Sequence, residues 1–261
     1  MNILVCLKMV SRATYTDMLC SDDASDDRLS GGAIEINPAD AYALETALKL
    51  KDRYGAYVTV LSMSPMLAEP MLRSALAMGA DEAVLVCDRI FAGSDTIATA
   101  KTLSAALKAL PRQDMIFCGS KAIDSETGHI GAQLAALNEL RYMGGVLAVN
   151  ELRDGRLCVK HAGKHGAEEY SLVLPAVFSI INGPGMIRSP TIFGLRSSAK
   201  REIRIMTGDT LHLTAEQAGK NASGTETVRI DRLSFAHRHG AYTDDVHDGA
   251  AGLAEMLECA K

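Results

Sequence analysis

Residues 57–87 read YVTVLSMSPMLAEPMLRSALAMGADEAVLVC, and this stretch decides the fold class. The apolar run Tyr57–Ser62 predicts a buried strand, and Ala83–Cys87 predicts a second one. Between them, Leu67–Met78 has the pattern of a helix that ends at Gly79, a residue suited to a left-handed C-cap. A strand, a helix and a strand joined by short links predict two parallel strands connected by a right-handed crossover.

The same alternation continues on both sides of this stretch. Further strands are expected at Ile3–Leu7 and Asp114–Cys118, and further helices at Ala39–Arg53, Ser94–Leu110 and Glu126–Leu140. The pattern predicts an α/β fold, with a doubly wound, mainly parallel sheet and helices on both faces. In such sheets ligands bind beyond the carboxyl ends of the strands. These ends are expected near Leu7, Ser62, Cys87 and Cys118.

The second half of the chain has a different pattern. A small β-meander is expected at Val146–Glu151, Arg156–His161 and Glu168–Leu174, with a hairpin turn at Asp154-Gly155, and Ala176–Asn182 is expected to join the main sheet. From Gly183 to Asp248 apolar periodicity fades, which indicates an extended C-terminal arm, and Ala250–Cys259 regains a helical pattern. We therefore expect an α/β domain at 1–190 and an arm at 191–261. The acidic segment Thr14–Gly32 is expected to be a solvated excursion.

Composition excludes several classes of protein. The 261 residues are 48% apolar and 23% charged, which is typical of a globular chain, and the net charge of −5 argues against binding to nucleic acid. The six cysteines lie far apart, without the short spacings of zinc or redox sites. No secretory signal and no membrane span are recognised, so we expect a cytoplasmic protein without a metal. The chain has no tryptophan and only five phenylalanines, so few rings are available to stack on a ligand.

The segment that follows the strand Asp114–Cys118 is the strongest candidate for a binding site. Gly119 offers a turn, hydroxyls follow at Ser125 and Thr127, and a helix is expected to begin there. A helix start with nearby glycines suits an anionic group such as a phosphate. Plain N-capping by Asp124 or Ser125 explains the same residues, so both interpretations stay open.

Two other helix starts follow predicted strands. Asn37 and Pro38 suit an N-cap and a first helical position, with early negative charge at Asp40. The run Phe91–Thr96 opens another helix, either with Ser94 or Asp95 as a cap or in contact with a phosphate or ribose. His129 suits a polar first-turn residue better than a proton carrier. No pattern of a nucleophile, acid or base stands out, so no catalytic residue is predicted.

Together these segments resemble the β subunit of electron transfer flavoproteins. The resemblance covers nearly the whole chain. It is carried by Asn37-Pro38-Ala39-Asp40-Ala41-Tyr42-Ala43-Leu44-Glu45, by Ala75-Leu76-Ala77-Met78-Gly79-Ala80-Asp81, and by Ala122-Ile123-Asp124 with Thr127 and Gly131. It implies a heterodimer with an α subunit that carries a redox-active FAD, and electron exchange with an acyl-CoA-type or other flavin dehydrogenase.

The resemblance also implies a nucleotide site on this subunit, holding AMP in ordinary carriers and a second FAD in electron-bifurcating members. The implied cofactor-binding residues are Cys6, Asn37, Pro38, Ala39, Asp40, Met63, Asp95, Thr96, Ala122, Ile123, Asp124, Ser125, Glu126, Thr127, Gly128, His129, Ile130, Gly131 and Gln133. The run Phe91–Thr96 resembles the form found in bifurcating members. This likeness favours FAD over AMP as the nucleotide of the site, and it makes NADH the expected electron donor.

The resemblance further implies that Ile192 anchors the partner dehydrogenase. Two departures from the family pattern concern the nucleotide contacts and the choice of dehydrogenase: the order Gly119, Ser120, Lys121, and the serines Ser197 and Ser198 where lysine is common. The alternatives are a conventional carrier with structural AMP and, from another class, a nucleotide-hydrolysing α/β protein.

Overall fold

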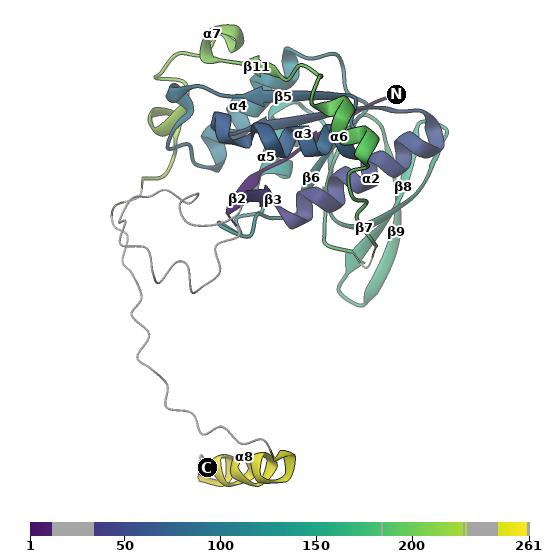
Figure 1. Ribbon diagram of the computed structural model, residues 1–261, viewed down its shortest axis with the longest axis vertical. Helices are drawn as coiled ribbons and strands as arrows, with labels where there is room; N and C mark the ends of the chain where they lie inside the picture. The colour runs from purple at the N-terminus through teal and green to yellow at the C-terminus, as the bar shows by residue number, and fades with distance from the viewer. Residues whose placement is uncertain (12–33, 184, 227, 229–244, 260–261) are drawn as a thin grey trace. The chain divides into compact units, whose positions relative to one another are not determined.

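The computed structural model describes residues 1–11, 34–183, 185–226, 228 and 245–259 (Figure 1). Two compact units are present, Met1–Glu226 and Thr227–Lys261. The expected excursion Thr14–Gly32 lies outside the described residues. No helix within the described ranges is long and apolar enough to cross a bilayer.

The first unit is built on a nine-stranded sheet with the order β11-β5-β4-β1-β6-β10-β7-β8-β9 (Figure 1). Its strands are β1 (Asn2–Cys6), β4 (Tyr57–Met63), β5 (Glu82–Val86), β6 (Met115–Gly119), β7 (Arg141–Arg153), β8 (Arg156–Gly163), β9 (Gly166–Val173), β10 (Ala176–Ile180) and β11 (Arg204–Met206). All neighbours from β11 to β7 are parallel, whereas β7, β8 and β9 pair antiparallel. A small antiparallel sheet joins β2 (Met9–Ser11) and β3 (Ile34–Ile36). The predicted α/β class is confirmed.

Helices cover both faces of the sheet. The main helices are α2 (Pro38–Tyr54), α3 (Glu69–Met78), α4 (Thr96–Lys108) and α5 (Ile130–Leu137), with short 3-10 turns at η1 (Met66–Ala68) and η2 (Arg89–Phe91). Side chains alternate along β1, so Ile3 and Val5 pack with α2 and α3, while Leu4 packs with α4 and α5. This arrangement confirms the doubly wound architecture.

The helix expected at Glu126–Leu140 is shorter than predicted and runs from Ile130 to Leu137. Glu126 and Gly128 have φ values of 52° and 65°, in the left-handed region that a helix cannot include. The four residues before Ile130 therefore form a loop. The hairpin turn predicted at Asp154-Gly155 is confirmed. The two residues have φ values of 48° and 70°, as a two-residue hairpin turn requires.

The described part of the arm contains short elements that apolar periodicity does not reveal. They are α6 (Ile192–Ser198), β11, α7 (Gly208–Leu211) and η3 (Gly219–Ala222), all within the first compact unit. β11 adds an edge strand beside β5. The division at 190/191 stays a prediction. In the second unit, the expected terminal helix is present as α8 (Val246–Cys259).

Candidate functional site

Asp40 ties together three elements at the carboxyl edge of the sheet. Its Oδ2 accepts a hydrogen bond of 2.8 Å from the backbone N–H of Lys8, just beyond β1. Its Oδ1 accepts one of 2.8 Å from the N–H of Gly119, the last residue of β6. Asp40 lies in the first turn of α2 and is buried. One carboxylate therefore holds the ends of β1 and β6 against the start of α2.

Burial raises the pKa of Asp40 from its usual value near 3.8 to about 6, against the opposing effect of the two backbone hydrogen bonds. The carboxylate is ionised at pH 7 and can accept both N–H groups. Below pH 6 the carboxyl group becomes protonated, which removes the cost of burying its charge.

This raised pKa gives the stability a pH dependence. The folded protein holds the Asp40 proton more tightly than the unfolded chain, so the stabilising contribution is complete below pH 3.8 and is lost as the pH rises through 6. Between pH 4 and pH 7 we expect the free energy of unfolding of the wild type to fall by about 2 kcal/mol relative to that of Asp40→Asn. Urea unfolding at both pH values measures this difference, and equal pH slopes in the two proteins would contradict it.

Asn37 fastens the β6–α5 loop, which comprises residues 120–129. It precedes α2, but its side chain makes no cap hydrogen bond within the described chain. Instead, Nδ2 donates to the carbonyl of Lys121 at 3.0 Å, and Oδ1 accepts from the N–H of Ile123 at 3.1 Å. Asn37 is buried with 1% of its surface exposed. Asn37 and Pro38 thus occupy the N-cap and first helical positions of α2 as predicted, but the Asn37 side chain binds the loop instead of capping the helix.

Lys8 is a second residue that holds the β6–α5 loop. Its Nζ lies 2.6 Å from both carboxylate oxygens of Asp124 and 3.4 Å from Oγ of Ser125. Sequence reasoning missed this role, because a lysine after an apolar strand signals only the end of that strand. Its partner is 116 residues away, and no local pattern indicates such a contact.

The N-terminus of α5 opens onto this loop. The N-cap position is His129, and no side-chain cap is present there among the described residues, so the prediction of a cap by Asp124 or Ser125 is wrong. The first-turn N–H groups have no partner within the helix itself. A Cβ on Gly131 would overlap Oγ of Ser179, so this glycine lets α5 lie close to β10.

Gln133 carries a buried polar atom that suits a ligand. Its Nε2 donates to Oγ1 of Thr96 at 3.2 Å, which links α5 to α4. Its Oε1 is buried and has no hydrogen-bond partner in the described part of the chain. Buried acceptors are rarely left unpaired. An adenine nucleotide offers hydroxyl and amine donors, so the residues present fit such a ligand.

The remaining predicted positions differ in their surroundings. Direct contacts join Asn37, Asp40 and Asp124 to Lys8 and the β6–α5 loop, and a separate contact joins Thr96 to Gln133. Cys6 and Met63 lie at the carboxyl ends of β1 and β4, whereas Ile123, Glu126, Thr127 and His129 are exposed on the loop and its junction with α5. Glu126 forms an ion pair of 2.9 Å with Lys121. Asp95 caps α4 and binds its own chain.

Two predicted side chains are taken up by the core. Phe91 is buried with 5% of its surface exposed, so its ring packs within the protein. Cys6 lies beside Cys118 on the neighbouring strand, and the hydrogen bond between the two thiols, together with burial, raises the pKa of Cys118 well above its usual value. A thiol in this state is a poor nucleophile.

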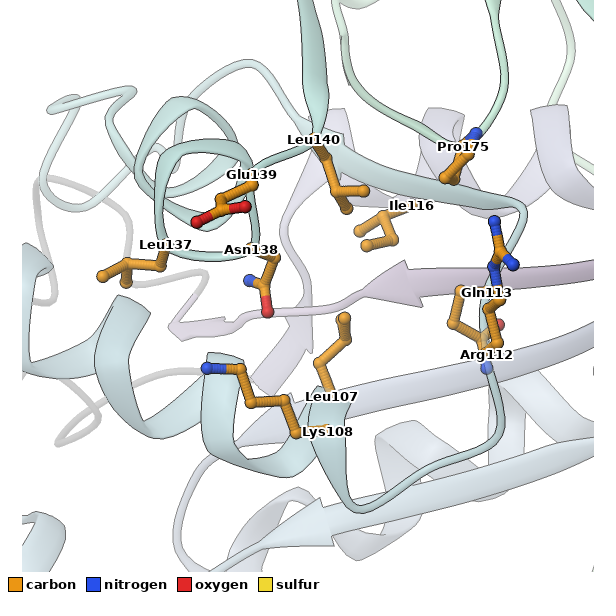
Figure 2. A pocket seen from close by; sticks show the side chains of 10 residues that line it. All are labelled: Leu107, Lys108, Arg112, Gln113, Ile116, Leu137, Asn138, Glu139, Leu140 and Pro175. Carbon is orange, nitrogen blue, oxygen red and sulfur yellow. The ribbon is translucent and has the colours of Figure 1, made fainter.

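The hollow in Figure 2, of about 390 Å³, lies at the opposite edge of the sheet. Leu107 near the end of α4 and Leu140 after α5 point towards each other across it, and Ile116 near the start of β6 lies between them. A second hollow of about 370 Å³ lies between α2 and β7. Neither contains the residues of the β6–α5 loop.

Comparison with known proteins identifies the family. The family model described as the electron transfer flavoprotein domain matches residues 30–201. The chain is 36% identical to the electron transfer flavoprotein subunit beta of Thermoanaerobacterium thermosaccharolyticum, over 98% of both chains.

Two further relatives carry names of larger complexes. Subunit CarD of the caffeyl-CoA reductase–Etf complex of Acetobacterium woodii is 35% identical, over 88% of this chain and 87% of its own. The acryloyl-CoA reductase electron transfer subunit gamma of Anaerotignum propionicum is 43% identical, over 61% of this chain and 64% of its own. The chain therefore belongs to the electron transfer flavoprotein family and is a member of its β-subunit type.

Proposed function

We propose that this chain is the β subunit of a heterodimeric electron transfer flavoprotein that binds an adenine nucleotide at the carboxyl edge of its sheet. The observation that carries the proposal is the uncapped N-terminus of α5, next to the unpartnered Oε1 of Gln133. A phosphate accepts hydrogen bonds from such N–H groups and is favoured by the helix dipole. The gathered residues thus suit an anionic ligand with additional donors.

The residues of the site divide into two roles. The backbone of residues 127–131 binds the phosphates, and Gln133 accepts from a hydroxyl or amine of the ligand. Asn37, Asp40 and Lys8 act indirectly, since their polar atoms hold the loop and the strand ends. The binding energy therefore comes mainly from backbone amides, in keeping with the scarcity of aromatic rings.

We favour FAD over AMP as the nucleotide. When bound here, FAD would supply the capacity to accept a hydride from NADH and to release the two electrons singly to two acceptors. The protein binds and orients the cofactor and tunes its potential, with no side-chain acid, base or nucleophile.

Similarity to subunits named for caffeyl-CoA and acryloyl-CoA reductases supports a dehydrogenase of the acyl-CoA type as partner. We further propose that the C-terminal arm packs on the α subunit and that the complex is cytoplasmic.

Helix α6 is proposed as the docking surface for that dehydrogenase. Ile192 and Phe193 have 76% and 83% of their surfaces exposed, which is unusual for large apolar residues. The inner side of the helix is fixed, because a Cβ on Gly194 would overlap the carbonyl oxygen of Ala77 in α3. Arg73 of α3 also donates to the carbonyl of Ser198 at 2.8 Å. A rigidly held helix thus presents two apolar side chains to solvent.

We expect Ile192→Ala to slow electron delivery to the dehydrogenase by about tenfold, since exposed apolar anchors of this size contribute about 1–2 kcal/mol to an interface. Flavin content should stay unchanged, because Ile192 is largely exposed on α6, which packs on α3, whereas the proposed nucleotide site lies at α5. Leu137→Ala is the control, since Leu137 is an exposed aliphatic residue on α5, a helix that packs on α4. Loss of flavin from Ile192→Ala would contradict the docking role.

The nucleotide count per complex tests the proposal as a whole. The chain is expressed with its α subunit, and FAD and AMP are released and quantified by absorbance and chromatography. Two FAD per heterodimer support the bifurcating form, and one FAD with one AMP supports the conventional carrier. Phosphate release from ATP without bound flavin would support the hydrolase instead, and a complex with no nucleotide in this chain would contradict the site.

A further inference from the structure

Residues 219–226 form a strap across the loop that precedes α4. A Cβ on Gly219 would overlap the carbonyl oxygen of Ile90, so the strap lies directly on this loop. The N–H of Lys220 donates to the carbonyl of Ala92 at 3.0 Å. Oγ of Ser223 accepts from the N–H of Asp95 at 2.9 Å. The strap is the last segment of the first compact unit, which ends at Glu226.

The carboxylate of Asp95 holds the end of this strap. Oδ2 accepts from the N–H groups of Gly224 and Thr225 at 2.7 and 3.1 Å, and from the hydroxyl of Thr225 at 3.2 Å. Oδ1 accepts from the N–H of Ala98 at 2.9 Å and so caps α4. Burial acts to raise the pKa of Asp95, yet these hydrogen bonds outweigh it and hold the pKa below its usual value. Both oxygens of the ionised Asp95 carboxylate thus accept hydrogen bonds from groups of this chain.

The next residue, Thr96, faces the nucleotide site. Its Oγ1 accepts from Nε2 of Gln133, whose Oε1 is the unpartnered atom described above. Asp95 and Thr96 are consecutive at the start of α4, so the strap and helix α5 are joined through two adjacent residues. A ligand that fixes Gln133 also fixes the start of α4, and with it the acceptor of the strap.

We infer that Asp95 is a positioning residue that couples nucleotide binding at α5 to the order of the strap. This inference rests on the proposed nucleotide site. A bound nucleotide stabilises the hydrogen bonds of Gly224 and Thr225, and by linkage a released strap weakens nucleotide binding by the same factor.

The variant Asp95→Asn tests the contact with the strap separately from the capping of α4, because it removes the first and keeps the second. Asparagine is as good an N-cap as aspartate, so Oδ1 continues to accept from Ala98. Its Nδ2 then faces the N–H donors of Gly224 and Thr225, which lose their acceptor. Asp88→Asn is the matched control, because Asp88 caps η2 in the same way and binds the N–H of Gly208 at 2.9 Å instead of the strap.

Hydrogen exchange of the Gly224 and Thr225 amides tests the inference in the full-length chain, purified with its α subunit, stripped of nucleotide and then saturated with AMP. Without AMP, we expect exchange about tenfold faster in Asp95→Asn than in the wild type, and unchanged in Asp88→Asn. AMP should slow exchange several-fold in the wild type and in Asp88→Asn, and leave Asp95→Asn unaffected.

Each of the other possible outcomes contradicts one specific part of the inference. Equal exchange in Asp95→Asn and the wild type would overturn the anchoring role of Asp95. Binding of AMP to the wild type, measured by equilibrium dialysis, without slower exchange would overturn the coupling. Failure of both AMP and FAD to bind this subunit of the wild type would overturn the proposed site and the coupling together, while the comparison without nucleotide still decides the anchor.

Discussion

Gly119→Ala is expected to lower the free energy of unfolding by about 3 kcal/mol and to abolish nucleotide binding. A Cβ at this position would lie 2.7 Å from the backbone N of Asp40 and 2.8 Å from the carbonyl carbon of Ala39. Both are backbone atoms in the first turn of α2, so β6 or the whole helix has to shift. The hydrogen bond from Gly119 to Asp40 is then lost, and a buried carboxylate loses one of its two backbone donors.

Urea unfolding and nucleotide content measure this effect. Gly252→Ala in α8 is the control, because a Cβ there meets no described atom within 4 Å. The control is expected to stay within about 1 kcal/mol of the wild type, since alanine replaces glycine in a helix. A Gly119→Ala protein with wild-type stability and full nucleotide content would show that the close approach of β6 and α2 is not required.

Asn37→Ala is expected to lower nucleotide affinity more than tenfold and stability by about 2 kcal/mol. It leaves the carbonyl of Lys121 and the N–H of Ile123 without their side-chain partner. Each lost hydrogen bond of this kind costs about 1 kcal/mol, and the loop loses the contacts that fix its path. Titration with AMP and urea unfolding provide the two measurements.

Asn138→Ala is the matched control for Asn37→Ala. Asn138 also uses both ends of its amide, donating to the carbonyl of Leu134 at 2.7 Å and accepting from Oγ of Ser104 at 3.0 Å. It lies beside the hollow at the opposite edge of the sheet (Figure 2). This variant should lose stability but keep its nucleotide affinity. Equal losses of affinity in both variants would mean that the effect of Asn37 is merely one of stability.

The order of strands and helices was predictable because it depends on local patterns. The apolar runs that predict β1, β4, β5 and β6 mark buried parallel strands, and Pro38 and Gly55 mark the two ends of α2. Prediction was wrong where the backbone has a special conformation. Glu126 in the left-handed region delays the start of α5, and nothing in its side chain indicates this.

The contacts of the side chains around the β6–α5 loop were not predictable from the sequence. Asn37 has the sequence signature of an N-cap, yet its amide binds a loop 84 and 86 residues further along the chain. Asp40 suggests a favourable charge at a helix start, whereas its carboxylate joins two strands. Such contacts depend on the closing of the sheet, and local propensities carry no information about them. For the same reason, the short helix α6 and the edge strand β11 were missed.

A crystal structure of the heterodimer with its native nucleotide tests the central claim most directly. The account predicts phosphate oxygens within hydrogen-bond distance of the backbone N–H groups at the start of α5, and a ligand donor on Oε1 of Gln133. It also predicts that Asn37, Asp40 and Lys8 keep their contacts with the chain. A nucleotide bound elsewhere on this subunit, for example in the hollow at the amino edge of the sheet, would contradict it.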